Sequence, residues 1–357
     1  MQTAFLKLLD NYVVGFVSVM FKPQISCLNA DPATLLLIRP GGIGDAVLLA
    51  STVSALKNKY PKLAITLLAE QRNASVFSLI PGVDKVFCYD HPGEFFQAVR
   101  SHYDVVIDTE QWYRLSAVVA RMVRAPVKIG FDTNERRRMF THCVPYDQLA
   151  YETDNFLALL KPLGINSENS METTNLSLPL QSLSNAGLLL RSLDSDSFVT
   201  IFPGGSIPEK RWGADSFRLV AEALSDSGMK IVVVGGKEDQ RWGEIIAGGG
   251  LGLNLTGLTS LPETAAVIQK SALLLSGDSG VLHIAAGLGV PTVSLFGPGR
   301  TEKWAPRGEN HIVINKELPC SPCTTFGNTP PCPIDARCMK DITVDEVVNA
   351  VKALLDN

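Results

Sequence analysis

From residue 34 the chain reads Thr34-Leu-Leu-Leu-Ile-Arg-Pro-Gly-Gly-Ile-Gly-Asp45, an apolar run that ends in a Pro-Gly-Gly turn. A helical pattern follows over residues 43–60. The same order returns at Phe198-Val-Thr-Ile-Phe-Pro-Gly-Gly-Ser206, and a second helical pattern begins near Ala214. A short apolar run followed by Gly or Pro and then by a helix is typical of a strand in an α/β domain. The repeat therefore predicts two similar α/β halves.

Each half contains further apolar runs that alternate with helical patterns. They lie at residues 34–38, 64–68, 85–89 and 104–108 in the first half, and at 198–202, 230–235, 272–276 and 292–296 in the second. The runs are apolar throughout, as expected for parallel strands that helices cover on both faces. We expect two Rossmann-like, doubly wound domains. Ligands bind beyond the carboxyl ends of such strands, so two facing domains would form one interdomain cleft.

Length and composition agree with two ordinary globular domains. At roughly 150 residues per domain, 357 residues suggest two. The net charge of −4 provides no general basic field, which argues against a nucleic acid polymer as partner. The polar stretch 167–197 reads as a linker. We expect an N-terminal apolar helix at 1–30, domains at 31–175 and 176–340, and a C-terminal helix at 341–357.

The N-terminal stretch Tyr12–Phe21 is apolar but too short to cross a bilayer. It lacks the basic start and the clear cleavage site of a secretory signal. A helix that covers the core and an anchor at a membrane surface both remain open as interpretations.

The loop at Gly42-Ile43-Gly44-Asp45 lies between the first strand and its helix. Its glycines would let a ligand approach the backbone, and the helix N-terminus favours an anion. The spacing differs from Gly-x-Gly-x-x-Gly, which argues against a dinucleotide-dependent oxidoreductase. Asp45 is either a first-turn residue that complements the helix dipole or a general base at the ligand edge.

Two loops in the second half suit an anionic ligand. Gly204, Gly205 and Ser206 precede the adjacent cations Lys210 and Arg211, which together would form a phosphate cradle, although a solvated Gly-Pro turn fits the same residues.

The other loop, Gly277-Asp278-Ser279-Gly280, joins a buried strand to a helix of small residues, whose free amides favour an anion. His283 in that helix is either a neutral hydrogen-bonding group or a packed structural residue. Asp278, Ser279 and His283 lie too close in sequence for a hydrolase triad, which draws its members from separate elements.

Together, Gly42-Ile43-Gly44-Asp45, Lys210-Arg211-Trp212 and Gly277-Asp278-Ser279-Gly280 with His283 resemble glycosyltransferase family 9, the family of bacterial lipopolysaccharide heptosyltransferases. The resemblance implies a GT-B fold, an acceptor site with Gly42 and Gly44 in the first domain, and a nucleotide-sugar site in the second. It further implies an inverting transfer that needs no metal or other cofactor for catalysis. No acidic pair is apparent at the ligand edge that would bind Mg²⁺.

The resemblance also assigns roles to residues. Asp45 would be the base for the acceptor hydroxyl, Lys210 would balance the diphosphate, and Ser279 and Gly280 would hold it through backbone amides. Glu238 stands where a ribose-binding acid is expected. The remaining residues expected on the donor side are Gly204, Gly205, Ser206, Asp278 and His283.

The function that this resemblance implies is transfer of a heptose, from ADP-heptose, to a lipid-anchored core oligosaccharide of lipopolysaccharide. The protein would work in the cytoplasm, peripherally at the inner face of the inner membrane. The alternatives are a family member that uses another nucleotide sugar and a non-catalytic nucleotide-sugar-binding protein. Arginines expected either to contact acidic groups of the acceptor or to form a solvated basic surface are Arg114, Arg121, Arg124, Arg136, Arg137 and Arg138.

Four cysteines follow one another as Cys320-x2-Cys323-x8-Cys332-x5-Cys338. The first pair has the spacing of a zinc knuckle, and the second pair is wider than usual. A structural zinc ion, disulfides and free thiols all remain open interpretations of this segment.

Overall fold

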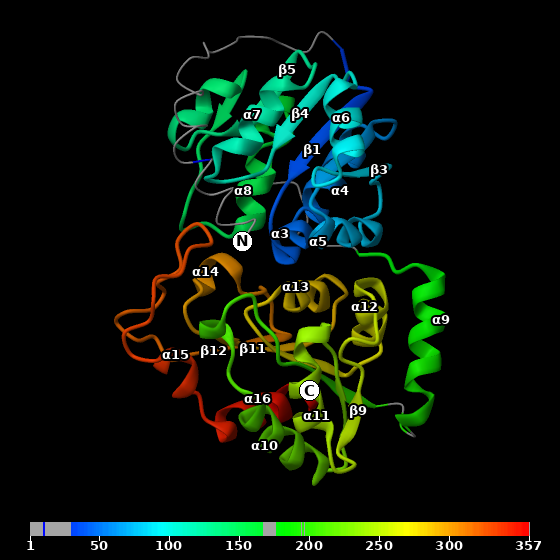
Figure 1. Ribbon diagram of the computed structural model, residues 1–357, viewed down its shortest axis with the longest axis vertical. Helices are drawn as coiled ribbons and strands as arrows, with labels where there is room; N and C mark the ends of the chain where they lie inside the picture. Colours follow the sequence, from blue (N-terminus) through cyan, green and yellow to red (C-terminus); the bar gives the residue numbers. More distant parts are fainter. Residues whose placement is uncertain (1–9, 11–29, 167–175, 194, 196, 357) are drawn as a thin grey trace. The chain divides into compact units, whose positions relative to one another are not determined.

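Two parallel sheets organise the chain. The computed structural model describes residues 10, 30–166, 176–193, 195 and 197–356 (Figure 1). The chain divides into two units, Met1–Thr173 and Thr174–Asn357, and each contains one sheet. The helix predicted at 1–30 falls, except for Asp10 and Ala30, outside the described residues.

The sheet of the first unit has six strands in the order β3-β2-β1-β4-β5-β6. The strands are β1 (Thr34–Arg39), β2 (Ala64–Ala69), β3 (Lys85–Cys88), β4 (Val105–Asp108), β5 (Val127–Phe131) and β6 (His142–Val144). The helices are α3 (Ile43–Leu48), α4 (Ala50–Lys59), α5 (Gln71–Ala74), α6 (Pro92–Arg100), α7 (Arg114–Met122) and α8 (Glu152–Ala158), with 3₁₀ turns η2 (Ser75–Leu79), η3 (Asn134–Met139) and η4 (Lys161–Leu163). All neighbouring strands run parallel, and β1 pairs with both β2 and β4.

The side chains of β1 alternate between the two faces of this sheet and are buried on both. Leu36 and Ile38 are buried together with Ala98 of α6 and Ala117 of α7. Leu35 and Leu37 are equally buried and point to the opposite face, because successive side chains of a strand alternate. Helices α4 and α8 contact each other. Burial on both faces explains why β1 contains no polar residue between Thr34 and Arg39.

The second unit repeats this design. Its strands are β7 (Phe198–Phe202), β8 (Lys230–Val233), β9 (Gly252–Asn254), β10 (Leu273–Gly277), β11 (Thr292–Phe296) and β12 (His311–Asn315), in the order β12-β11-β10-β7-β8-β9. Its helices are α9 (Leu180–Leu189), α10 (Ala214–Ser225), α11 (Gln240–Ala247), α12 (Leu261–Gln269), α13 (Gly280–Gly287), α14 (Thr301–Trp304), α15 (Arg337–Lys340) and α16 (Val344–Leu355), with 3₁₀ turns η6 (Leu190–Leu193), η7 (Pro208–Lys210) and η8 (Lys237–Asp239). All pairs of neighbouring strands are parallel here too.

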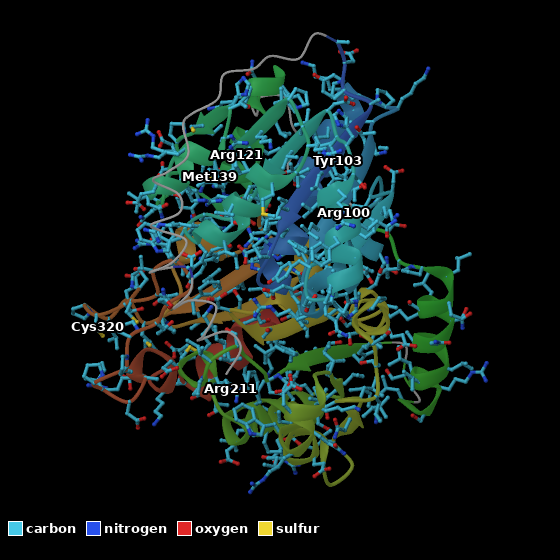
Figure 2. The ribbon with its side chains drawn as sticks, turned by 45° about the horizontal axis from the view of Figure 1, so that its top comes forward. Arg100, Tyr103, Arg121, Met139, Arg211 and Cys320 are labelled. Carbon is cyan, nitrogen blue, oxygen red and sulfur yellow. The ribbon has the colours of Figure 1, made fainter. Side chains whose placement is uncertain are left out.

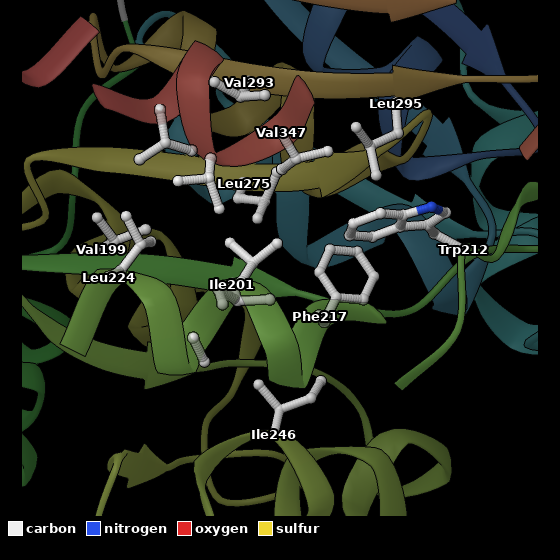
Figure 3. Packing of buried hydrophobic residues seen from close by; sticks show 14 of the residues in the cluster. Val199, Ile201, Trp212, Phe217, Leu224, Ile246, Leu275, Val293, Leu295 and Val347 are labelled. Carbon is white, nitrogen blue, oxygen red and sulfur yellow. The ribbon is translucent and has the colours of Figure 1, made fainter. Parts of the chain in front are cut away.

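One face of the second sheet packs on α10, α11 and α16 (Figure 3). Val199 and Ile201 of β7 meet Phe217 of α10, and Val347 of α16 joins the same cluster. Trp212 packs edge-to-face on Phe217 with 5.1 Å between ring centroids, and its indole N–H donates to the Ile342 carbonyl. The loop after β7 is thus fixed to the segment before α16.

The two sheets have the same topology. Numbered within its own unit, each has the order 3-2-1-4-5-6, in which the strand order reverses between the first strand and the fourth. The fold predicted from the sequence, α/β with two doubly wound Rossmann-like sheets, is therefore confirmed. The reversal marks the ligand crevice of such sheets. It lies between β1 and β4 in the first unit and between β7 and β10 in the second.

The linker predicted at 167–197 is wrong in part. Residues 180–189 form α9, which packs on α12, and Ala186 is fully buried against Phe198 and Val267. The polar composition of the stretch concealed this contact, since α9 buries only a narrow stripe of side chains.

Candidate active site

In the first unit, Asp45 lies in the first turn of α3, directly beyond the carboxyl end of β1. Its carboxylate Oδ1 lies 3.9 Å from the Arg39 guanidinium and accepts a 3.2 Å hydrogen bond from the Gln111 amide. The Asp45 side chain is 22% exposed. A Cβ at Gly42 would lie 3.2 Å from its Oδ2, so glycine there leaves room for the carboxylate. The Asp45 carboxylate is thus fixed by Arg39 and Gln111 and is still accessible to solvent.

Arg39, the last residue of β1, is buried and serves as the central cation of this site. Its guanidinium donates to the Thr109 carbonyl and lies 3.5 Å from Glu110 Oε2. Burial acts to lower the pKa of Arg39, but nearby carboxylates, Asp45 foremost, raise the pKa above its usual value. Arg39 is therefore a buried cation beside the Asp45 carboxylate.

Gln111 links Asp45 to a second acid. Its Nε2 also donates to Glu152 Oε1 at 2.5 Å, and Tyr146 donates to the other Glu152 oxygen at 2.9 Å. Burial, and then Glu152, raise the pKa of Tyr146, so the phenol remains a donor. We did not predict Gln111, Glu152 or Tyr146 as site residues. Gln111 follows β4 at the ligand edge, and that position is a signal that could have identified it.

The arginines expected to contact the acceptor are in part structural. Arg136 and Asp108 are fully buried and form a 2.6 Å ion pair, so the expectation that Arg136 meets the acceptor is wrong. Arg114 pairs with Glu135 at 2.8 Å and lies 3.6 Å from Asp10. These arginines balance internal carboxylates.

No acidic pair that would bind Mg²⁺ was apparent at the ligand edge from the sequence, but the structure shows further acids there. Asp108, Glu110 and Glu152 accompany Asp45 at this end of the first sheet, but each is bonded to an arginine, an amide or a phenol. Burial raises the pKa of Glu110, against the effect of Arg39 and Arg136. The four acids outnumber the two buried guanidinium groups, and the Gln111 amide and the Tyr146 phenol supply further donors to the network.

In the second unit, Lys210 and Asp278 meet at the reversal point of the sheet. Lys210 ends η7 after β7, Asp278 follows β10, and the Lys210 ammonium lies 2.5 Å from Asp278 Oδ2. Both side chains are largely buried, at 16% and 8% exposed. A Cβ at Gly277 would lie 3.0 Å from the Lys210 carbonyl, so the two loops pack backbone to backbone. The structure thus brings together these two predicted residues.

The helix α13 begins beside this pair. Ser279 is its N-cap, and the hydroxyl accepts from the Leu282 amide and contacts Ser276 Oγ at 2.9 Å. Gly280 is the first residue of the helix, whose first-turn amides have no partner within the helix. His283 is buried and packs edge-to-face on Trp304, which fits a packed residue of the helix.

The Pro-Gly-Gly loop after β7 packs against the loop after β8. A Cβ at Gly204 would lie 2.8 Å from Asp239 Oδ2, which accepts from the Gly236 amide. Glu238 is exposed on that neighbouring loop, at the same edge of the sheet. Ser206 is exposed, and Gly205 is partly exposed. The predicted ribose-binding acid and the predicted phosphate loop therefore lie on adjoining loops.

Arg211 does not take part in a phosphate cradle of two cations. Its guanidinium donates twice to the Gly205 carbonyl, at 3.0 and 2.9 Å, and lies over the Trp242 ring. Figure 2 labels Arg211 within the second unit. Arg211 thus stabilises the loop itself. Of the two cations predicted for the cradle, Lys210 is the one that pairs with Asp278.

The four cysteines of residues 320–338 are free thiols. All four line one cavity, together with Glu209 and Pro298. Burial, and then the neighbouring thiols, raise the pKa of Cys323 and Cys338. In the described part of the chain, the disulfide interpretation therefore has no support.

No helix among the residues that the structure describes is long and apolar enough to cross a membrane.

Two doubly wound units of equal topology, each with polar residues at its reversal point, define the class of GT-B glycosyltransferases. Residues 93–332 match glycosyltransferase family 9 (heptosyltransferase), and the chain belongs to this family. It is thus a glycosyltransferase.

Similar proteins agree with this family. Lipopolysaccharide heptosyltransferase 3 of Escherichia coli is 29% identical over 296 residues, which cover 75% of this chain and 85% of that protein. A family 9 glycosyltransferase of Veillonella parvula has a TM-score of 0.79 at 21% identity, over 92% of this chain and 99% of that one. E. coli ADP-heptose lipopolysaccharide heptosyltransferase II has a TM-score of 0.74 at 22% identity, over 90% and 98% of the two chains.

Proposed function

We propose that this glycosyltransferase moves a heptose from ADP-heptose to a lipopolysaccharide core acceptor, with inversion at the anomeric carbon and without a catalytic metal. The names of similar proteins include lipopolysaccharide, heptosyltransferase and ADP-heptose. They support heptose as the transferred sugar, lipopolysaccharide as the acceptor and ADP-heptose as the donor of this proposal. The observation that carries the mechanism is the pairing of Lys210 with Asp278 beside the N-terminus of α13, because it provides a site for a leaving diphosphate.

Asp45 is the general base of this proposal. Its carboxylate takes the proton of the acceptor hydroxyl while the hydroxyl oxygen forms a bond to the anomeric carbon. The bond from that carbon to the diphosphate oxygen breaks at the same time, and ADP leaves with the electron pair. Gln111 and Arg39 hold the carboxylate in place, and a general base must lie within hydrogen-bond reach of the proton that it takes.

Lys210 and α13 stabilise the leaving diphosphate. The ammonium and the first-turn amides of Ser279, Gly280 and the residues after them are preorganised donors, and such donors lower the barrier where negative charge develops. Asp278 holds Lys210 in place, and the ammonium can share its remaining hydrogens with phosphate oxygens. These groups provide the charge that Mg²⁺ supplies in other transferases.

The remaining donor contacts follow from the loops around Lys210. Gly205 and Ser206 let a ligand approach the backbone, buried Gly204 allows the loop to pack against Asp239, and exposed Glu238 accepts hydrogen bonds from the ribose hydroxyls. His283 supports α13 from its buried face. Gly42 and Gly44 give the acceptor access to Asp45.

The acceptor of this proposal is a lipid-anchored core oligosaccharide, which places the protein peripherally at the cytoplasmic face of the inner membrane. A net charge of −4 does not attract phosphorylated lipid by itself. Local cations on exposed surfaces, such as Arg124 and Arg137, would supply that attraction.

The roles of Asp45 in the first unit and Lys210 in the second can be separated by single substitutions. Asp45→Asn should lower kcat by about 10²- to 10⁴-fold, the usual contribution of a general base, and leave ADP affinity unchanged. Lys210→Met should weaken ADP binding as well as turnover. Asp84→Asn is the matched control, because Asp84 pairs with Lys57 at the start of β3, at the opposite edge of the sheet. Near-normal turnover of the Asp45 variant would remove Asp45 as the base.

Donor identity needs its own measurement. ADP-heptose should raise the melting temperature more than UDP- or GDP-sugars at equal concentration, because a ligand that binds only the folded state stabilises it. A larger shift with another nucleotide sugar would replace ADP-heptose as the donor and leave the family assignment intact.

A further inference from the structure

Three side chains of the kinds that bind metals lie together where β3 ends and α6 begins. They form the pattern Cys88-x2-His91-x2-Glu94. Cys88 is the last residue of β3, His91 is the N-cap of α6, and Glu94 lies in the first turn of that helix (Figure 1). The Cys88 sulfur, one ring nitrogen of His91 and one carboxylate oxygen of Glu94 lie within 4.8 Å of one another. A thiol, an imidazole and a carboxylate thus converge in the first unit.

The backbone fixes this arrangement. The His91 amide donates to the Cys88 carbonyl at 3.2 Å, which closes a turn, and the Tyr89 amide donates to the Ala69 carbonyl of β2 at 2.9 Å. The Phe95 amide donates to the His91 carbonyl at 2.9 Å, so the turn continues directly into α6. The turn therefore holds Cys88 and His91 beside the first turn of the helix, where Glu94 lies.

The Glu94 carboxylate is oriented by one of its oxygens. Oε2 accepts a 2.7 Å hydrogen bond from the Cys88 amide, while Oε1 lies 3.1 Å from His91 Nδ1. A hydrogen bond of this kind is the usual support of a carboxylate that binds a metal. A role in stabilising the start of α6 would explain Glu94 alone. It requires neither the Cys88 thiol nor the His91 ring, which caps none of the amides described for this helix.

The distances suit a zinc ion. Zinc binds thiolate sulfur at about 2.3 Å and imidazole nitrogen or carboxylate oxygen at about 2.0–2.2 Å, so neighbouring ligand atoms of a tetrahedral site lie about 3.4–3.6 Å apart. The atoms of His91 and Glu94 are 3.1 Å apart, and the Cys88 sulfur is within 4.8 Å of its two partners. Small rotations of these side chains therefore complete the set.

The types of ligand also favour zinc. A set of one sulfur, one nitrogen and one oxygen suits a borderline ion such as Zn²⁺, whereas Mg²⁺ and Ca²⁺ prefer oxygen ligands. Two residues between the Cys and the His is the ligand spacing of short zinc-binding loops.

Three protein ligands leave one position of a tetrahedral ion open. The side chains of His91 and Glu94 are 48% and 41% exposed, so solvent reaches this place. β2 lies between β3 and β1, and neighbouring strands are about 4.8 Å apart, so about 10 Å separates β3 from the strand before Asp45. The cluster is thus a separate site from the network around Asp45.

We propose that Cys88, His91 and Glu94 bind one Zn²⁺ ion, with the fourth position open to water or to another oxygen ligand. Binding releases the thiol proton of Cys88 to solvent, and the ion takes one bond from each of the three side chains. The site is independent of the proposed transfer reaction, which uses Asp45 and Lys210.

Protection from chemical modification tests the site in the unsubstituted protein. In full-length protein stripped of metal with a chelator, excess Zn²⁺ should slow alkylation of Cys88 at least about tenfold, because the free thiolate is the nucleophile. Zinc should also slow the reaction of His91 with diethyl pyrocarbonate. Mass spectrometry of peptides reads each residue separately. Cys143 and His102, both exposed in the first unit, should react equally with and without zinc.

Two variants separate a three-residue site from a lone thiol. Glu94→Gln keeps an oxygen that can accept from the Cys88 amide, but it removes the anionic ligand that zinc takes. Zinc should then slow alkylation of Cys88 less than about twofold, and His91→Ala should have the same effect. His102→Ala is the matched control and should retain full protection. The rate with zinc is compared with the rate without zinc in the same variant, which cancels any change in the intrinsic reactivity of the thiol.

Two outcomes would overturn the site. Equal reactivity of Cys88 with and without zinc in the unsubstituted protein would show that no ion binds there. Full protection of Cys88 in His91→Ala or in Glu94→Gln would show that the altered side chain is not a ligand. Both outcomes would leave the proposed transfer reaction untouched, since neither measurement involves ADP or an acceptor.

Discussion

The position of Asp45 depends on a side chain from another strand end. Gln111 offers one amide group to both Asp45 and Glu152, and Glu152 is fixed in turn by Tyr146. A neutral amide between two carboxylates satisfies both without adding charge, whereas a third acid there would repel them. Gln111 is therefore a positioning residue for the proposed base.

Gln111→Ala should lower kcat about 10- to 100-fold, because a hydrogen bond to a charged group contributes about 1.5–3 kcal/mol. The KM for the donor should not change, since the donor contacts belong to the second unit. Steady-state kinetics with the donor varied at fixed acceptor would check both values.

A double-mutant cycle separates positioning from general damage to the fold. In an Asp45→Asn background, Gln111→Ala should cause little further loss, because the carboxylate that it aims is already gone. Fully additive losses in the double variant would contradict the positioning role.

Lys128 gives the first unit a pH-dependent stability. It is 3% exposed on β5, and its ammonium donates to the carbonyls of Arg121 and Val123. Burial, and then Arg121, lower the pKa of Lys128 to about 8. The unfolded chain binds the proton more tightly, so the free energy of unfolding should rise as the pH increases from about 8 to 10.

Lys128→Met should remove this rise. Urea unfolding at several pH values from 7 to 10 should show an advantage of the variant below about pH 8 that shrinks as the pH approaches 10. Lys230→Met, at an exposed position that begins β8, should show no such trend. A difference from wild type that stays constant with pH would mean that the pKa of Lys128 is unshifted.

At the level of single residues, the sequence predicts groups that belong to a local pattern. Asp45, Lys210 and Ser279 each lie in a strand-turn-helix loop, and the structure places all three at the ligand edge of a sheet. Arg136 was misjudged because its buried partner, Asp108, lies 28 residues away in the chain. Pairing over such a distance leaves no local pattern.

Among the elements, α10 shows how one helix separates core from surface. Phe217 is 1% exposed in the cluster of Figure 3, whereas Leu219, two residues later on the same helix, is 51% exposed. Phe217→Ala should reduce the free energy of unfolding of the second unit by about 3–5 kcal/mol, since it removes a buried ring and leaves a cavity.

The matched control is Leu219→Ala, which introduces the same residue into the same helix. It should change stability by less than about 0.5 kcal/mol, as is usual for surface substitutions. Urea unfolding would compare the two variants, and equal losses would show that α10 does not pack as described.

The elements that were predicted and those that were not differ in composition. All eight apolar runs identified in the sequence coincide with strands to within two residues, whereas β5, β6, β9 and β12 were not identified. The strand β5 was not identified, because Lys128 and Gly130 interrupt its apolar run. Glycine is needed at position 130, since a Cβ there would collide with the Phe140 ring. Strands β6 and β9 have three residues each, too few for a periodic pattern.

For the whole molecule, the two units share one topology but have different roles in the proposed reaction. Each unit offers one reversal point, and chemically different groups occupy the two points: an acid held by an amide in the first and a cation beside a helix N-terminus in the second. The duplication of Pro-Gly-Gly indicated two similar sheets, but only the structure shows that the neighbouring strand ends, after β4 and β10, complete each site.

This division predicts where ADP protects the chain. Hydrogen exchange should slow at residues 203–213, 235–240 and 277–283 when ADP binds, because a bound ligand suppresses local opening of the loops that it contacts. Residues 39–48 in the first unit should exchange at the same rate with and without ADP. Asp45→Asn should preserve this pattern, and Lys210→Met should weaken it. Protection confined to residues 39–48 would instead assign the nucleotide to the first unit, and Lys210 would then lose its proposed role in binding the leaving diphosphate.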